Sequence, residues 1–198
     1  REQEALKTLT RINGESMAKT ILEEIRISVG DKTKGELFSF GFLIVIIGIL
    51  LSVFQQFVGI NVVLYYAPEI FKKMGSGTDA SLMQTIIVGI INLIFTVIAI
   101  VSVDKFGRKP LMIIGALGMA ISMTALGFSF YFEHVGILSL IFMLTYVAAF
   151  AMSWGPVTWV LLSEIFPNKI RGRAMAIAVA MQWIANYLVS WTFPMLDD

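Results

Sequence analysis

Three carboxamides and two tyrosines stand within one uncharged, apolar stretch that is long enough to cross a bilayer. They are Gln55, Gln56, Asn61, Tyr65 and Tyr66. An unsatisfied polar group in hydrocarbon is costly, so side chains of this kind need partners inside the membrane. Amides donate hydrogen bonds to hydroxyls and accept them, and aromatic rings stack on C–H faces. The combination favours a binding site for an uncharged, polyhydroxylated ligand such as a sugar.

Further amide and indole side chains occur in the later uncharged stretches of the chain. Asn92 stands alone in the second stretch, and Trp159 lies in the fourth. Gln182 and Trp183 are adjacent in the fifth, and Asn186 follows Gln182 by about one helical turn. A lone amide in a membrane helix commonly bonds to a neighbouring helix, which is the interpretation we favour for Asn92 or Asn186 taken singly. The three amides of the first stretch together favour ligand binding.

The spacing of the first cluster does not by itself form one face of a helix. At roughly 100° per residue, Gln56 and Asn61 are about 140° apart on an ideal helix, whereas Asn61 and Tyr65 share a face. Gly59 stands between the two groups and would permit a kink or local unwinding, as transporters use at their binding sites.

Charged residues are confined to a few places in this chain, which is 57% hydrophobic and only 15% charged. At roughly 20 residues per membrane helix, several stretches without Asp, Glu, Lys, Arg or His are long enough to span a bilayer. The sequence therefore predicts an all-α membrane protein with five transmembrane helices. The predicted spans are 37–66, 80–103, 111–130, 137–163 and 174–196.

The basic residues predict the orientation of these spans. Thirteen of the fifteen Lys and Arg residues lie before residue 35 or in the loops 104–110 and 164–173, and the other two are Lys72 and Lys73. By the positive-inside rule, the side with thirteen is cytoplasmic. Residues 1–36 are therefore expected to form cytoplasmic linker helices, with two short amphipathic segments separated at Asn13-Gly14.

Little in the sequence predicts covalent chemistry. There is no cysteine, the only histidine is His134 in a short outer loop, and the spans contain no nucleophile–base pair. We expect no cofactor, no metal and no enzymatic activity. The chain starts at Arg1 and has an odd number of predicted spans, so we expect it to be an excerpt from a longer protein.

Two cytoplasmic motifs resemble those of the major facilitator superfamily. Asp104–Pro110 has the pattern Asp-x-x-Gly-Arg-Lys, which resembles the superfamily's loop motif, and Glu164–Gly172 resembles the sugar porter signature Glu-x-x-Pro-x-x-x-Arg-Gly. The resemblance implies a charge network that closes the inner mouth, whereas solvated loop charges are the alternative. The implied network consists of Asp104, Arg108, Glu164 and Arg171.

Gly155-Pro156 interrupts the fourth span's hydrogen bonds and is predicted to act as a hinge.

The first span adds Gln-Gln-x-x-Gly-x-Asn-x-x-x-Tyr-Tyr, and the whole chain is then similar to bacterial D-xylose–proton symporters of the sugar porter family, which are homologues of the glucose facilitators. The resemblance implies that residues 37–198 are an incomplete C-terminal transmembrane half with helices seven to eleven. It also implies an extracellular gate at Tyr65 and Tyr66. Gln182 favours xylose carriers, because glucose facilitators usually have Asn there. The implied sugar contacts are Gln55, Gln56, Asn61, Asn92, Trp159, Gln182 and Trp183.

The expected function is transport of a neutral monosaccharide by alternating access, most simply D-xylose–proton symport across a bacterial inner membrane. D-Glucose is a second possible substrate, the proton is the co-substrate, and the N-terminal half of the same carrier is the partner. These spans contain no ionisable Asp, Glu, Lys, Arg or His, so passive hexose facilitation fits the residues equally well. A sugar-sensing receptor that does not transport, and a scaffold whose amides only join helices, are further alternatives. Sugar preference, oligomeric state and resting conformation stay open.

Overall fold

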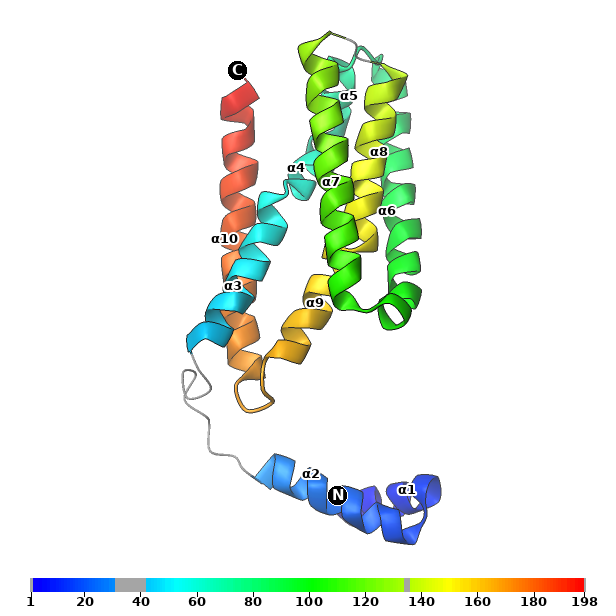
Figure 1. Ribbon diagram of the computed structural model, residues 1–198, viewed down its shortest axis with the longest axis vertical. Helices are drawn as coiled ribbons and strands as arrows, with labels where there is room; N and C mark the ends of the chain where they lie inside the picture. Colours follow the sequence, from blue (N-terminus) through cyan, green and yellow to red (C-terminus); the bar gives the residue numbers. More distant parts are fainter. Residues whose placement is uncertain (1, 31–41, 134–135, 198) are drawn as a thin grey trace. The chain divides into compact units, whose positions relative to one another are not determined.

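The computed structural model describes residues 2–30, 42–133 and 136–197, and every regular element within these ranges is an α-helix (Figure 1). The chain divides into two compact units, Arg1–Glu36 and Leu37–Asp198, which are described separately. Residues 37–41 of the first predicted span and His134 lie outside the described residues.

The N-terminal unit is a pair of packed helices, α1 (Glu2–Asn13) and α2 (Glu15–Gly30). Gly14 joins them with a left-handed φ of 79°, a conformation that glycine adopts without steric cost. Ala18 is fully buried, whereas Ile12 and Met17 are 71% and 60% exposed. The apolar side chains of the two predicted amphipathic segments are therefore only partly buried within this unit.

Within its described residues, the second unit contains five helical spans that are long and apolar enough to cross a membrane, as predicted. The first and fourth spans each consist of two helices that meet at a break. A short helix that was not predicted, α5, follows the first span and has Pro68 in its first turn, where the missing N–H leaves no helical bond unmade. The elements are α3 (Phe42–Phe57), α4 (Ile60–Tyr65), α5 (Ala67–Lys73), α6 (Thr78–Phe106), α7 (Arg108–Tyr131), α8 (Ile137–Met152), α9 (Trp154–Ile165) and α10 (Arg171–Asp197).

The break in the first span lies at Gly59, as its position between the amides suggested. Gly59 has φ 85° and ψ 14°, in the left-handed region that residues with a side chain rarely adopt. At this break the carbonyl of Val58 accepts a hydrogen bond of 2.6 Å from the hydroxyl of Tyr146 on α8. The interruption of the helix is therefore compensated by a side chain from another span.

The break in the fourth span lies at Ser153, which has φ −129° and ψ −89°. Gly155 and Pro156, where we predicted the interruption, instead belong to the first turn of α9. Proline is tolerated in a first turn because its fixed φ suits the helix and its N–H would have no partner there. The predicted kink is thus present, but it precedes the proline.

Two sets of helices pack side by side in this unit (Figure 1). α10 runs along α3, while α7 and α6 both pack on α8. The larger core lies around Phe71, Met143 and Tyr146, and a smaller one lies around Leu162 and Phe166. Many apolar side chains on the outside of the helices stay exposed, which is the arrangement expected for a lipid-facing surface.

The contact between α7 and α8 depends on Gly115. A methyl group added at Gly115 would overlap the side chain of Ser153 and approach the carbonyl oxygen of Ala149 to 3.1 Å. We expect Gly115→Ala to destabilise the protein by about 1–3 kcal/mol, the usual cost of overpacking. Gly127→Ala on the same helix is the matched control, because nothing lies within 4 Å of its added methyl group. Thermal unfolding in detergent measures both; equal midpoints for the two variants would contradict this packing.

Candidate functional site

A pocket of about 270 Å³ is lined by residues of both broken spans, α3–α4 and α8–α9, and by residues of α6 and α10. None of its thirteen lining residues is charged. All seven residues predicted to contact a ligand line it, and so does Tyr65. The complete lining is Gln55, Gln56, Ile60, Asn61, Leu64, Tyr65, Asn92, Phe150, Gly155, Trp159, Gln182, Trp183 and Asn186.

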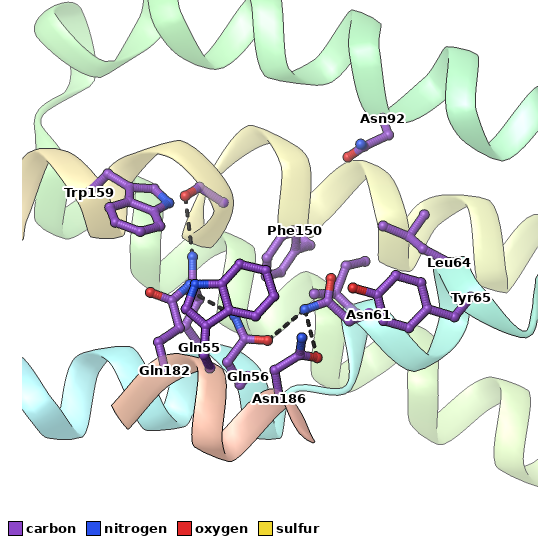
Figure 2. A pocket seen from close by; sticks show the side chains of 13 residues that line it. Gln55, Gln56, Asn61, Leu64, Tyr65, Asn92, Phe150, Trp159, Gln182 and Asn186 are labelled. Atoms are coloured by element: carbon purple, nitrogen blue, oxygen red, sulfur yellow. Dashed lines mark hydrogen bonds between the residues drawn. The ribbon is translucent and has the colours of Figure 1, made fainter. Parts of the chain in front are cut away.

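Gln55 lies at the centre of the hydrogen bonds in this pocket (Figure 2). Its Nε2 donates to the backbone carbonyls of Trp154 at 3.0 Å and Gly155 at 3.3 Å. Carbonyls only accept hydrogen bonds, so the orientation of the Gln55 amide is fixed. Its Oε1 therefore faces the other amides and accepts from Nε2 of Gln182 at 2.8 Å and from Nε2 of Gln56 at 3.4 Å.

The ordered series of donors and acceptors continues from Gln56 to α10. Asn61 donates from Nδ2 to Oε1 of Gln56 at 2.6 Å and to Oδ1 of Asn186 at 3.0 Å. Ser190 also donates to Oδ1 of Asn186, at 3.3 Å. An unbroken helix would separate Gln56 and Asn61 by about 140°, and the break at Gly59 is what brings them together.

This network leaves a defined set of groups for a ligand. Oε1 of Gln182 is buried and has no hydrogen-bond partner among the described residues. Leaving a buried acceptor unsatisfied costs about 1–3 kcal/mol, so this oxygen favours a molecule that donates to it. Both N–H groups of Asn61 are used within the protein, and its Oδ1 is therefore the atom that it offers to a ligand.

Asn92 and the indoles complete the pocket from different helices. Asn92 reaches the pocket from α6, across from the amides of α3 and α10, while Trp159 comes from α9 (Figure 2). Trp159 and Trp183 are 40% and 63% exposed, so their ring faces are available for stacking. Trp154, in contrast, donates its indole N–H to the carbonyl of Met112 at 3.0 Å and does not line the pocket.

The two tyrosines of the predicted gate lie in different surroundings. Tyr65 lines the pocket and is 58% exposed. Tyr66 is not among the lining residues; its ring lies 5.2 Å from that of Phe193, and its hydroxyl donates to the carbonyl of Ser190 at 3.5 Å. Tyr66 thus joins α4 to α10, and only Tyr65 is in a position to cover the pocket.

Three of the four predicted network charges meet at the ends of α6, α7 and α9. Arg108 donates from Nη2 and Nε to one carboxylate oxygen of Glu164, at 2.7 and 3.2 Å, and its Nη2 lies 3.4 Å from Asp104. Arg171, the fourth of these charges, instead donates from its Nε to the backbone carbonyl of Phe166 at 3.2 Å. That carbonyl is available because α9 has ended at Ile165 and Phe166 is extended.

Asn186 is a polar lining residue that is not among the sugar contacts implied by the sequence. Its position one turn after Gln182 was the available signal, and the bond with Asn61 shows why that position matters. The apolar lining residues Ile60, Leu64 and Phe150 had no signal, because they do not differ from core residues in type or spacing.

The family model described as "Sugar (and other) transporter" matches residues 1–198. The chain is 64% identical over its whole length to the D-xylose-proton symporter of Escherichia coli (strain K12), of which it covers 40%. It is 49% identical to the glucose facilitated diffusion protein of Zymomonas mobilis, covering 100% of this chain and 42% of that protein. The chain thus spans about 40% of the length of these curated relatives.

The fold of this chain also matches those of solved structures. The structure of the proton:xylose symporter XylE bound to 6-bromo-6-deoxy-D-glucose matches with a TM-score of 0.83 and 64% identity, over 98% of this chain and 42% of that one. The inward-open conformation of the xylose transporter XylE from E. coli matches with a TM-score of 0.74 and 60% identity, over 100% of this chain and 41% of that one.

Proposed function

The chain belongs to the sugar transporter family, and on this premise we propose that the whole protein carries a neutral monosaccharide across the membrane by alternating access. The observation that carries the proposal is the uncharged pocket with a buried, unsatisfied amide oxygen at Gln182. An anionic or cationic ligand would find no counter-charge among the lining residues, whereas hydroxyl groups match amides in both directions.

In this proposal, Oε1 of Gln182 and Oδ1 of Asn61 accept hydrogen bonds from sugar hydroxyls, while Asn186 and Asn92 have N–H groups to donate. Gln55 and Gln56 contribute to sugar binding through the hydrogen-bond network that joins them to Gln182. Trp159 and Trp183 stack on the C–H faces of the ring. In the whole carrier, the N-terminal half would supply the opposite wall.

D-Xylose is the favoured substrate and the proton the favoured co-substrate, because a relative that is 64% identical is a D-xylose-proton symporter. Passive facilitation is the second candidate, since the segments 37–66, 80–103, 111–130, 137–163 and 174–196 contain no Asp, Glu, Lys, Arg or His and another relative is named a glucose facilitated diffusion protein. Symport requires a titratable group in the rest of the protein. Neither mechanism forms a covalent bond, so the protein is not an enzyme.

Alternating access would use the two helix breaks together with the charged cluster. The bond between Arg108 and Glu164 joins the ends of α7 and α9, and it must open when the inner mouth opens. Tyr65 and Tyr66 act at the extracellular side, and Gly155 and Pro156 form part of the hinge. We place this carrier in the inner membrane of a bacterium.

Calorimetric titration of the full-length carrier tests the chemistry of the pocket. We expect saturable binding of D-xylose, and no binding of D-glucuronate, whose carboxylate lacks a counter-charge in this half of the site. D-Glucose serves as the neutral hexose for comparison. Binding of glucuronate as tight as that of the neutral sugars, or no binding of any neutral monosaccharide, would contradict the proposal.

A further inference from the structure

Each of the two broken spans donates side-chain hydrogen bonds to the backbone beside the break of the other span. Tyr146, on the span that breaks at Ser153, donates to the carbonyl of Val58 beside the break at Gly59. Gln55, on the span that breaks at Gly59, donates to the carbonyls of Trp154 and Gly155 just after the other break. Each span therefore contributes one polar side chain that bonds to backbone carbonyls at the other's break, and the carbonyl of Trp154 also accepts from the hydroxyl of Thr158 at 2.7 Å.

The hydrogen-bonding capacity of Gln55 is full. A glutamine amide has two N–H groups and two acceptor positions. Nε2 of Gln55 donates to two backbone carbonyls, and its oxygen accepts from Gln56 and Gln182. A ligand that bonds to Gln55 has to replace one of these internal bonds, and a ligand hydroxyl that accepts from it replaces a bond to the α9 backbone.

Only one of the two contacts is within reach of a ligand. Gln55 lines the pocket, as does Gly155, whose carbonyl it contacts. Tyr146 is fully buried in the core and is not among the lining residues. A molecule in the pocket can therefore compete with the bonds of Gln55 but not with that of Tyr146.

We infer that Gln55 is a positioning residue that couples occupancy of the pocket to the first turn of α9. A bound sugar draws the amide of Gln55 away from the carbonyls of Trp154 and Gly155, which releases this turn, while the Tyr146 contact stays closed as a fixed support. This inference rests on the proposed sugar-binding function. It assigns Gln55 a role in motion in addition to its contact with the sugar.

Hydrogen–deuterium exchange of the full-length carrier tests the coupling at the backbone amides of Val157, Thr158 and Trp159. In the wild-type protein we expect saturating D-xylose to speed their exchange. In Gln55→Met, which keeps the length of the side chain but has no N–H, exchange should already be faster without sugar by about five- to tenfold, the scale of one or two lost hydrogen bonds. Adding sugar to this variant should then change nothing at α9. Gln55→Asn, one methylene too short to reach the carbonyls, should behave in the same way.

Tyr146→Phe is the matched control, because it removes the other contact but leaves Gln55 in place. We expect this variant to keep the sugar-dependent change at α9. Wild-type exchange at α9 in sugar-free Gln55→Met would overturn the inference, and that result does not depend on any ligand. A sugar response that survives in Gln55→Met would overturn it as well. Failure of the proposed function is separate and visible, as absence of sugar binding to the wild-type protein in calorimetry.

Discussion

Replacing Asn61 with aspartate is expected to weaken sugar binding by at least about a hundredfold, although the two side chains have nearly the same shape. The Nδ2 of Asn61 donates to two oxygens, those of Gln56 at 2.6 Å and Asn186 at 3.0 Å. Aspartate places an oxygen at that position, so three acceptors face one another without a proton between them. Each unsatisfied buried group costs about 1–3 kcal/mol, and a hundredfold loss corresponds to about 2.7 kcal/mol.

Asn92→Asp is the matched control for this prediction. Asn92 undergoes the same chemical change in the same pocket, but among the described residues no side-chain hydrogen bond holds it. We expect calorimetric titration with D-xylose to show a smaller loss for Asn92→Asp than for Asn61→Asp. Wild-type affinity in Asn61→Asp would mean that the amide chain is not arranged with the directionality described.

Replacing Gln182 with leucine is expected to weaken sugar binding by about ten- to a hundredfold. The substitution removes the buried acceptor that has no internal partner, and it also removes the donor to Gln55 at 2.8 Å. A hydroxyl of the sugar would then face an apolar side chain, and the cost is that of burying it without a partner. The dissociation constant for D-xylose measures the effect.

Gln84→Leu on α6 is the control for Gln182→Leu. Gln84 is also a partly buried amide on a membrane helix, but it accepts a bond of 2.9 Å from Ser76 and lies outside the sugar pocket. We expect Gln84→Leu to bind sugar as the wild-type protein does. If both variants lose affinity equally, the loss reflects general destabilisation and Gln182 has no special place in the site.

The number of spans was predictable because charge-free length is a strong signal in a membrane protein. A bilayer excludes charged side chains and requires about 20 residues per helix, so the charged residues largely outlined the helices. The loop motif at Asp104 was less well predicted, since α6 continues to Phe106 and Gly107 alone joins it to α7. A charged sequence indicates the edge of the membrane, but it does not indicate where a helix ends.

Gly155-Pro156 predicted the second break to within one helical turn. Proline fits the first turn of a helix as well as a kink, and here the break lies at Ser153, three residues before Pro156, where the hydroxyl of Ser153 donates to the carbonyl of Ala149 one turn back. The break at Gly59 was easier, because only glycine readily adopts the left-handed conformation there.

The membership of the site was predicted largely from the family resemblance, since spacing alone separates Gln56 from Asn61. The hydrogen-bond partners were not predictable by either route. They depend on how α3, α9 and α10 pack, and on backbone carbonyls that have no sequence signature. The role of Tyr146 at Val58 was missed for the same reason: a buried tyrosine on an apolar helix resembles any core residue.

Uptake of radiolabelled D-xylose by the full-length protein in proteoliposomes tests the central claim most directly. We expect wild-type protein to carry the sugar into the vesicles and Asn61→Asp to carry almost none. An inward proton gradient should drive accumulation that collapses with a protonophore; equilibration unaffected by the gradient would establish the facilitator instead. If neither xylose nor glucose enters vesicles that contain folded wild-type protein, the protein does not transport these sugars and the account is wrong.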